Sequence, residues 1–259
     1  MKDKVTFIGS GNVAWHLTHL LHKAGYIVLE IISRNIEHAR ELALKCNAKA
    51  SNDFTSIHPE TELCIISVSD DAIKTITQHI PREDFTIVHT SGSTDMNLLS
   101  EFKHYGVLYP LQSLIRNSEL TNGQIPLCIE ASDEITKAKL TDLSKSIASD
   151  YYFLNSEDRL LAHIAAVFAS NFTNHMYSIA KEIMDEKNLT FNLFKPLILQ
   201  TTKRIETSEP QLCQTGPAYR GDINVINKHL SKLKNKPDYQ KIYTLVSQSI
   251  SNHHKQSHD

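Results

Sequence analysis

A short glycine-containing turn near the start of the chain has the residue types and spacing needed to hold phosphate groups. Gly9, Ser10, Gly11, Asn12 and Val13 follow an apolar run and open a segment whose apolar residues recur at helical spacing. The first glycine permits a tight turn, and the second lets a pyrophosphate approach the backbone. We expect these five residues to bind the diphosphate of a dinucleotide at a helix N-terminus. The alternative is a tight turn that binds no nucleotide.

The end of the second apolar run indicates which dinucleotide would bind. In an NAD site, an acidic residue about 20 residues after the glycines accepts the ribose hydroxyls. Here the run ends in Ser33, Arg34 and Asn35, and the nearest carboxylate, Glu30, lies inside the run. A planar guanidinium beside two hydrogen-bonding side chains suits a phosphate. The sequence therefore favours NADP over NAD, unless Arg34 is an ordinary surface charge.

Polar residues also follow three later apolar runs. Ligands of parallel sheets bind beyond the carboxyl ends of the strands, so these residues could share one crevice. The alternative for each is a turn without a ligand, and Asp70 and Asp71 are expected to cap a helix that starts at Ala72. The predicted contacts are Val68, Ser69, Ser91 and Gly92 with the cofactor, and Ser93 and Gln112 with the substrate.

A long apolar segment of the second half carries a stripe of polar residues. At about 100° per residue, His163, Asn171 and Asn174 fall within roughly an 80° sector of one helix. His163 could transfer a proton, and Asn171 could hold a carbonyl or imine group, so both are predicted to be catalytic. Asn174 is predicted to contact the substrate. The alternative is a satisfied polar ladder within a subunit interface.

One further loop could bind an anion, whereas no metal site is predicted. The segment 215–222 holds two glycines and a proline, and its Arg220 could bind a substrate carboxylate. Asp222 is expected to cap the next helix. His16, His19 and His22 recur three residues apart without a carboxylate or cysteine to complete a ligand set, so we expect them to face solvent.

The order of the elements predicts an α/β fold with a doubly wound, mostly parallel sheet, followed by an all-α domain. Strand-like and helical patterns alternate up to Phe153, after which Asn155 can cap a helical pattern that runs to about Lys187. The predicted domains are residues 1–153 and 154–259, with a disordered tail at 252–259. The expected strands are 4–8, 27–32, 63–68, 86–90, 106–109 and 126–130, and the further helices are 13–23, 36–45, 98–104, 196–205, 222–233 and 238–252.

Composition and charge argue against several kinds of partner. The chain has 259 residues, 41% of them hydrophobic and 22% charged, which is typical of a soluble globular protein. A net charge of −2 argues against nucleic acid or an anionic membrane as the main partner. The segment 160–180 lacks charged residues but is too polar to face lipid. Scattered cysteines and the absence of a leader pattern predict a cytoplasmic protein.

Taken together, these motifs resemble the superfamily of NADP-linked oxidoreductases that includes pyrroline-5-carboxylate reductase, 6-phosphogluconate dehydrogenase and deazaflavin-dependent NADP oxidoreductases. Within it, the chain is most similar to a bacterial family with a Rossmann-like domain and a helical domain of unknown function. The resemblance implies a homodimer built through the helical domain. It is carried by the segments 7–14, 67–73, 89–93, 163–171 and 215–222, the last of which is the most specific.

The chain departs from two branches of that superfamily. Hydroxyacid dehydrogenases carry a catalytic lysine four residues before an asparagine, and Val167 stands at that position relative to Asn171. The serine- and threonine-rich helix motif of pyrroline reductases is also absent. We therefore expect an NADP-dependent oxidoreductase that acts on a small carbonyl or imine compound, and Arg220 would suit an anionic one. The alternative is a dinucleotide-binding redox sensor or regulatory subunit without catalytic activity.

Overall fold

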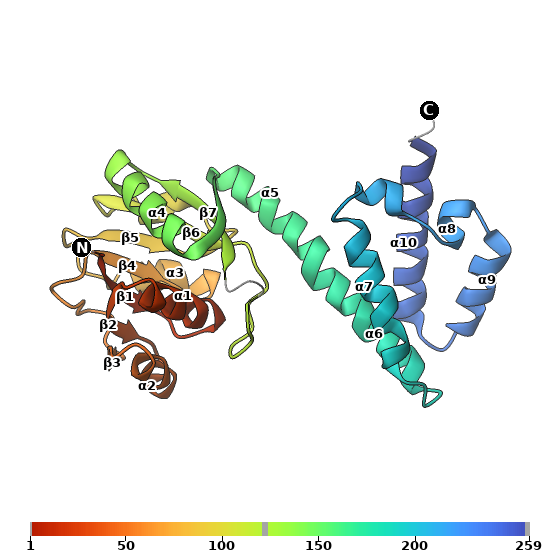
Figure 1. Cartoon of the computed structure of the whole chain (residues 1–259), viewed down its shortest axis with the longest axis horizontal. Coiled ribbons are helices and arrows are strands. Elements are labelled where there is room, and N and C mark those ends of the chain that lie inside the picture. Colours follow the sequence, from red (N-terminus) through yellow and green to blue (C-terminus); the bar gives the residue numbers. More distant parts are fainter. Residues whose placement is uncertain (1, 121–123, 257–259) are drawn as a thin grey trace. The chain divides into compact units, whose positions relative to one another are not determined.

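The structure, a computed structural model, describes residues 2–120 and 124–256. It divides into two compact units, residues 1–172 and 173–259, and each is described by itself (Figure 1). The last strand ends at Phe153, where the sequence predicts the change from sheet to helix, whereas the division into compact units falls later. The functional boundary between residues 153 and 154 stays a prediction.

The first unit is built on an eight-stranded sheet whose order is β3-β2-β1-β4-β5-β6-β7-β8. All neighbouring strands are parallel except β6 and β7. The order reverses direction between β1 and β4, which creates a crevice beyond their carboxyl ends. The predicted doubly wound, mostly parallel sheet is thus confirmed. The strands are β1 (Lys4–Ile8), β2 (Ile27–Ile32), β3 (Lys49–Ser51), β4 (Leu63–Ile66), β5 (Thr86–His89), β6 (His104–Pro110), β7 (Ile125–Ala131) and β8 (Ala148–Phe153).

Helices cover both faces of this sheet, which is why its central strands are buried on both sides. All four residues of β4 and all four of β5 are buried. One apolar cluster contains residues of α1, α2 and α4, and the other contains residues of α3 and of a 3-10 turn, η1. These elements are α1 (Asn12–Lys23), α2 (Ile36–Leu44), α3 (Asp70–Thr77), η1 (Met96–Leu99) and α4 (Glu134–Ile147).

Three local predictions are wrong. The helix expected at 98–104 is only the short turn η1, because residues from His104 onward join the sheet as β6. His16 does not face solvent; it is buried, and its Nε2 lies 2.9 Å from the carbonyl oxygen of Ile115. Asp70 and Asp71 do not cap α3, since they form its first turn and Ser69 holds the N-cap position.

Helices make up the rest of the chain, as predicted. The long helical pattern from Asn155 is present as α5 (Ser156–Ala166), a π-helical segment η3 (Val167–Phe172) and α6 (Thr173–Asp185). None of the described helices is long and apolar enough to cross a membrane. Residues 252–256, expected to be disordered, continue the last helix, and residues 257–259 lie outside the described part. The later elements are η4 (Phe191–Phe194), α7 (Lys195–Arg204), η5 (Pro210–Cys213), α8 (Pro217–Arg220), α9 (Ile223–Lys232) and α10 (Pro237–Gln256).

Candidate active site

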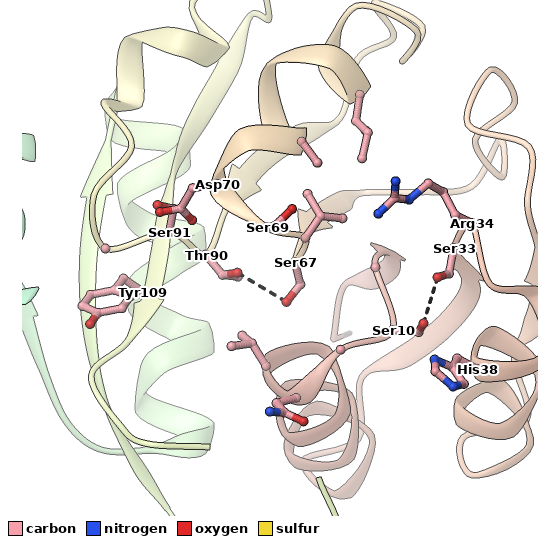
Figure 2. A pocket seen from close by; sticks show the side chains of 18 of the residues that line it. Ser10, Ser33, Arg34, His38, Ser67, Ser69, Asp70, Thr90, Ser91 and Tyr109 are labelled. Carbon is pink, nitrogen blue, oxygen red and sulfur yellow. Dashed lines mark hydrogen bonds between the residues drawn. The ribbon is translucent and has the colours of Figure 1, made fainter. Parts of the chain in front are cut away.

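A cleft of about 520 Å³ lies beyond the carboxyl ends of β1, β2, β4 and β5, at the crevice where the strand order reverses. It is lined by every residue that the sequence assigns to the cofactor except Asn35. Figure 2 shows Arg34 and His38 at one end of this cleft and Tyr109 at the other. The ends of separate strands therefore bring these predicted contacts together.

The glycine turn forms the floor of the cleft. Gly9 has φ +117°, and a Cβ built on it would lie 2.0 Å from the backbone oxygen of Ser67. Only glycine fits there, because both the backbone angle and the neighbouring strand exclude a side chain. Gly11 has no atom within 4 Å of the position that its Cβ would take. The two glycines thus differ: Gly9 allows the chain to turn, and Gly11 leaves open space.

The N-terminus of α1 fits a diphosphate. Its N-cap residue is Gly11, no side chain caps it, and its first turn contains no acidic residue. The first backbone N–H groups of a helix need acceptors, and a phosphate satisfies them while it interacts with the positive end of the helix dipole. In contrast, Asn35 caps α2 by accepting hydrogen bonds from the backbone N–H groups of Glu37 and His38. Asn35 therefore serves the helix rather than the cleft.

The Arg34 end of the cleft has the donors expected for a ribose phosphate. Ser10 donates a hydrogen bond to Ser33 across 2.8 Å, which joins the glycine turn to the end of β2. Arg34 is exposed and forms no ion pair with any described residue, and it lines the cleft together with His38. The sequence analysis missed His38, although it lies one helical turn beyond Arg34, on the first turn of α2. This end of the cleft can therefore supply a guanidinium and an imidazole to one anion.

The opposite end of the cleft holds a pair of polar rings. His163, on α5, lines the cleft with Ser91, Gly92 and Tyr109. The hydroxyl oxygen of Tyr109 lies 2.9 Å from Nδ1 of His163. The sequence placed the loop 109–113 near the crevice but assigned only Gln112 to the substrate. Gln112 does not line this cleft, and its side chain accepts a hydrogen bond from the backbone of Ser113.

Two other predicted contacts have different surroundings. Ser93 does not line the cleft, and its hydroxyl donates a hydrogen bond to Asp70. Asn171 is exposed on η3 and does not line the cleft either. The assumption of 100° per residue fails across η3, because a π-helical turn contains more residues than an α-helical one. The angular sector calculated for His163, Asn171 and Asn174 is therefore wrong, and their proposed roles remain predictions.

The remaining predicted substrate contacts belong to the second unit. Asn174 lies on α6, and Arg220 ends α8. The Arg220 guanidinium pairs with the carboxylate of Asp222, with Nη2 2.9 Å and Nε 3.0 Å from one of its oxygens. Asp222 occupies the N-cap position of α9 but makes no capping hydrogen bond, since its side chain is turned to Arg220. Asp222 therefore stands at the predicted N-cap position, but it does not form the capping hydrogen bond.

A buried ion pair holds the start of α5 against the loop that follows β5. The Arg159 side chain is fully buried and pairs with Glu130 of β7, and it also donates to the carbonyl oxygen of Thr94. Ser156 connects the same groups, since it donates to Glu130 and accepts from the backbone N–H of Met96. Arg159 precedes His163 by four residues, so the ion pair and the cleft histidine share one face of α5.

His89 is a second buried titratable group next to this network. It is fully buried at the end of β5, and its Nδ1 accepts a hydrogen bond from the backbone N–H of Ser91. Burial, together with the positive charge of Arg159, lowers the pKa of His89 to about 4. The imidazole is therefore neutral in the folded protein at pH values where an exposed histidine would be protonated.

This shift predicts that acid weakens the fold. Between the ordinary pKa of 6.5 and the folded value of about 4, the unfolded chain binds a proton that the folded chain does not. Stability should therefore fall as the pH drops through this window, by a His89 contribution on the order of 3 kcal/mol. Urea unfolding can be followed by the fluorescence of Trp15, the single tryptophan of the chain. His89→Asn keeps an acceptor near the position of Nδ1 but does not titrate, so its stability should fall less between pH 6.5 and pH 4. An equal fall in the variant would show that His89 is not the group responsible.

The geometry of the sheet, the glycine turn and the cleft defines a Rossmann-like protein whose cleft suits a dinucleotide. Comparison with known proteins supports this class. Residues 4–90 match the family described as NADP oxidoreductase, coenzyme F420-dependent, and residues 125–250 match DUF2520, a domain of unknown function. A search of curated proteins finds no match to the chain.

Solved structures extend the match to the whole chain. A Bacteroides fragilis protein described as a candidate NADP oxidoreductase is 37% identical, with a TM-score of 0.89 over 97% of this chain and 98% of that one. The chain belongs to this family of NADP oxidoreductases, in which a DUF2520 region follows the nucleotide-binding domain. NADP linkage agrees with the preference predicted from Arg34.

More distant structures share the fold. Pyrroline-5-carboxylate reductase from Streptococcus pyogenes is 12% identical, with a TM-score of 0.66 over 97% of this chain and 99% of that one. An imine reductase from Myxococcus stipitatus, solved with NADP⁺, is 14% identical, with a TM-score of 0.63 over 98% and 93%. The fold expected from the sequence resemblance is thus confirmed.

Proposed function

We propose that the protein transfers a hydride between NADP(H) and a small compound with a carbonyl or imine group. The main support is that His163, a side chain able to transfer protons, lines the same cleft as the glycine turn and Arg34. A reductase needs both a site for the dinucleotide and a proton source near its reactive end. The names of the distant structural neighbours, imine reductase and pyrroline-5-carboxylate reductase, support this class of substrate.

Each part of the cleft has a role in this proposal. The backbone of Gly9–Val13 binds the diphosphate, and Arg34 with His38 binds the ribose phosphate. Val68, Ser69, Ser91 and Gly92 line the path toward the nicotinamide, which lies nearest to His163. Bound NADPH supplies the hydride, and His163 takes part in proton transfer. Asn171, which does not line the cleft, stays a proposed catalytic residue. The proposed substrate contacts, which do not line it either, are Ser93, Gln112, Asn174 and Arg220.

The test is NADPH consumption with a panel of small ketones, oxo-acids and cyclic imines, measured by absorbance. NADPH binding is measured separately by fluorescence. We expect binding and consumption of at least one class of substrate. NADPH binding without NADPH consumption across the panel would favour the non-catalytic sensor, because a sensor needs no proton donor.

We also propose a cytoplasmic homodimer formed through the second unit. Of the described side chains in residues 173–253, only Ala218 is buried, whereas Leu193, Leu197 and Leu199 are each at least 60% exposed. Such exposed apolar helices require a partner, and a second copy supplies an identical surface. Sedimentation velocity should show a dimer that Leu197→Glu with Leu199→Glu weakens; a monomeric wild-type protein would contradict this.

A further inference from the structure

The hydroxyl of Tyr109 meets the imidazole of His163 at the end of the cleft. Tyr109 lies on β6, and His163 lies on α5, 54 residues later in the chain. The rings meet edge to face, with centroids 5.8 Å apart, and the hydroxyl oxygen is 2.9 Å from Nδ1. Both side chains line the cleft that contains the glycine turn. A substrate in this cleft can therefore reach both members of the pair.

Gly92 sets how closely the two rings approach the cleft backbone. A Cβ at this position would lie 2.8 Å from Cγ and Nδ1 of His163 and 2.8 Å from Cζ of Tyr109. Such distances are shorter than van der Waals contact, so a larger residue would displace both rings. The backbone of the 91–93 loop thus packs directly on the pair. This packing fixes the hydroxyl beside the loop where we place the nicotinamide, as directed proton transfer requires.

We propose that Tyr109 is a catalytic residue whose hydroxyl gives the proton to the substrate, while His163 returns a proton to Tyr109. The inference rests on the proposed hydride transfer and names its proton donor. It assigns Nδ1–H of His163 as the donor to the Tyr109 oxygen, which leaves the phenolic hydrogen directed at the substrate. His163 then acts through Tyr109.

The surroundings of Tyr109 suit a donor that keeps its proton until it is needed. Burial, together with the nearby Cys128 and Asp70, raises the pKa of Tyr109 to about 12. The phenol therefore stays neutral at physiological pH and accepts no proton from the substrate. The alkoxide or amide charge that develops during reduction is more basic than a phenolate, so transfer from Tyr109 is favourable.

Atoms and charges balance over the cycle. Bound NADPH supplies the hydride, whose electron pair forms the new C–H bond while the double-bond electrons move to oxygen or nitrogen. That atom takes the Tyr109 proton, the Tyr109 oxygen takes the proton on Nδ1 of His163, and Nε2 of His163 takes one proton from solvent. Exchange of the ring proton with solvent then restores Nδ1–H. The Nε2 atom forms no hydrogen bond with the described residues, so none has to break before this atom takes a proton.

Tyr109→Phe tests the proposal because it removes only the hydroxyl and keeps the ring beside Gly92. With cyclohexanone or a cyclic imine as the probe, we expect turnover to fall about 100-fold at unchanged NADPH affinity. The double variant with His163→Phe should be no slower than the slower single variant, because the two residues act as a unit. Tyr105→Phe, on the same strand but outside the cleft, is the matched control.

A second measurement does not depend on turnover. Pyrrolidinone, a lactam whose carbonyl NADPH does not reduce, should bind the NADP⁺-loaded protein at least tenfold more tightly with Tyr109 than with Tyr109→Phe. Equal affinities, no binding by the wild type, or unchanged turnover in Tyr109→Phe would each overturn the proposal. If the wild type consumes no probe, the proposed function fails and lactam binding alone decides the role of Tyr109.

Discussion

Arg34→Ala should abolish most of the preference of this protein for NADPH over NADH. The Arg34 guanidinium lines the cleft, is exposed, and forms no ion pair with the described residues. A guanidinium can give two parallel, charge-assisted hydrogen bonds to a phosphate, each contributing about 1.5–3 kcal/mol. Their loss should weaken NADPH binding at least about 100-fold and leave NADH binding nearly unchanged, because NADH has no ribose phosphate. Fluorescence titration with each dinucleotide measures the ratio of the two affinities.

A neighbouring arginine provides the matched control for this experiment. Arg40 lies on the same helix, α2, that follows Arg34, but it pairs with Glu37 at 2.6 Å and does not line the cleft. Arg40→Ala removes the same charge from the same region, so it should leave the ratio within about twofold, as expected for a surface charge. If Arg34→Ala weakens the binding of NADH and NADPH equally, Arg34 stabilises the loop and does not bind the ribose phosphate.

Arg159→Ala should destabilise the first unit by about 3–5 kcal/mol, because it leaves the buried carboxylate of Glu130 without its cation. The Arg159 side chain is fully buried, and that of Glu130 is 15% exposed. The substitution also removes the donor to the carbonyl oxygen of Thr94. Urea unfolding followed by Trp15 fluorescence measures the change, since Trp15 is buried in α1 of the same unit.

Two controls separate an unpaired buried charge from other causes. Lys137→Ala breaks the exposed pair with Glu134, whose side chains are 48% and 88% exposed, and should cost less than about 1 kcal/mol. Arg159→Met combined with Glu130→Leu removes both charges and should regain much of the lost stability. A double variant as unstable as Arg159→Ala would show that packing, and not the orphaned carboxylate, causes the loss.

The positions of Arg159 and His163 on α5 also connect this ion pair to the cleft. His163 follows Arg159 by one helical turn, and the 91–95 loop contacts both residues through Gly92 and Thr94. Arg159→Ala is therefore expected to disturb the Tyr109–His163 pair as well as stability. The Arg34 experiment, at the other end of the cleft, should not be affected, because distant sites without shared partners act independently.

Local chemistry in the sequence was enough to predict the fold class and the glycine turn. Gly9 and Gly11 carry a signal at fixed spacing, because a tight turn and an open helix N-terminus each impose a local backbone requirement. The short β3 was missed, because a three-residue edge strand with the sequence Lys-Ala-Ser has no apolar pattern. The strand expected at 106–109 is β6, but His104 at its start was assigned to a helix, since only pairing with the neighbouring strand commits this residue to the sheet.

By itself, then, the sequence determined the α/β class, the glycine turn and the cation at the end of β2. Each of these depends on residues within a few positions of one another. Only the tertiary structure decided that Tyr109 pairs with His163 and that Arg159 is buried against Glu130. These pairings join residues from different strands and helices, and chain spacing does not encode them. They form because packing of the sheet and α5 brings these polar side chains together, and the fully buried Arg159 has no water to bond.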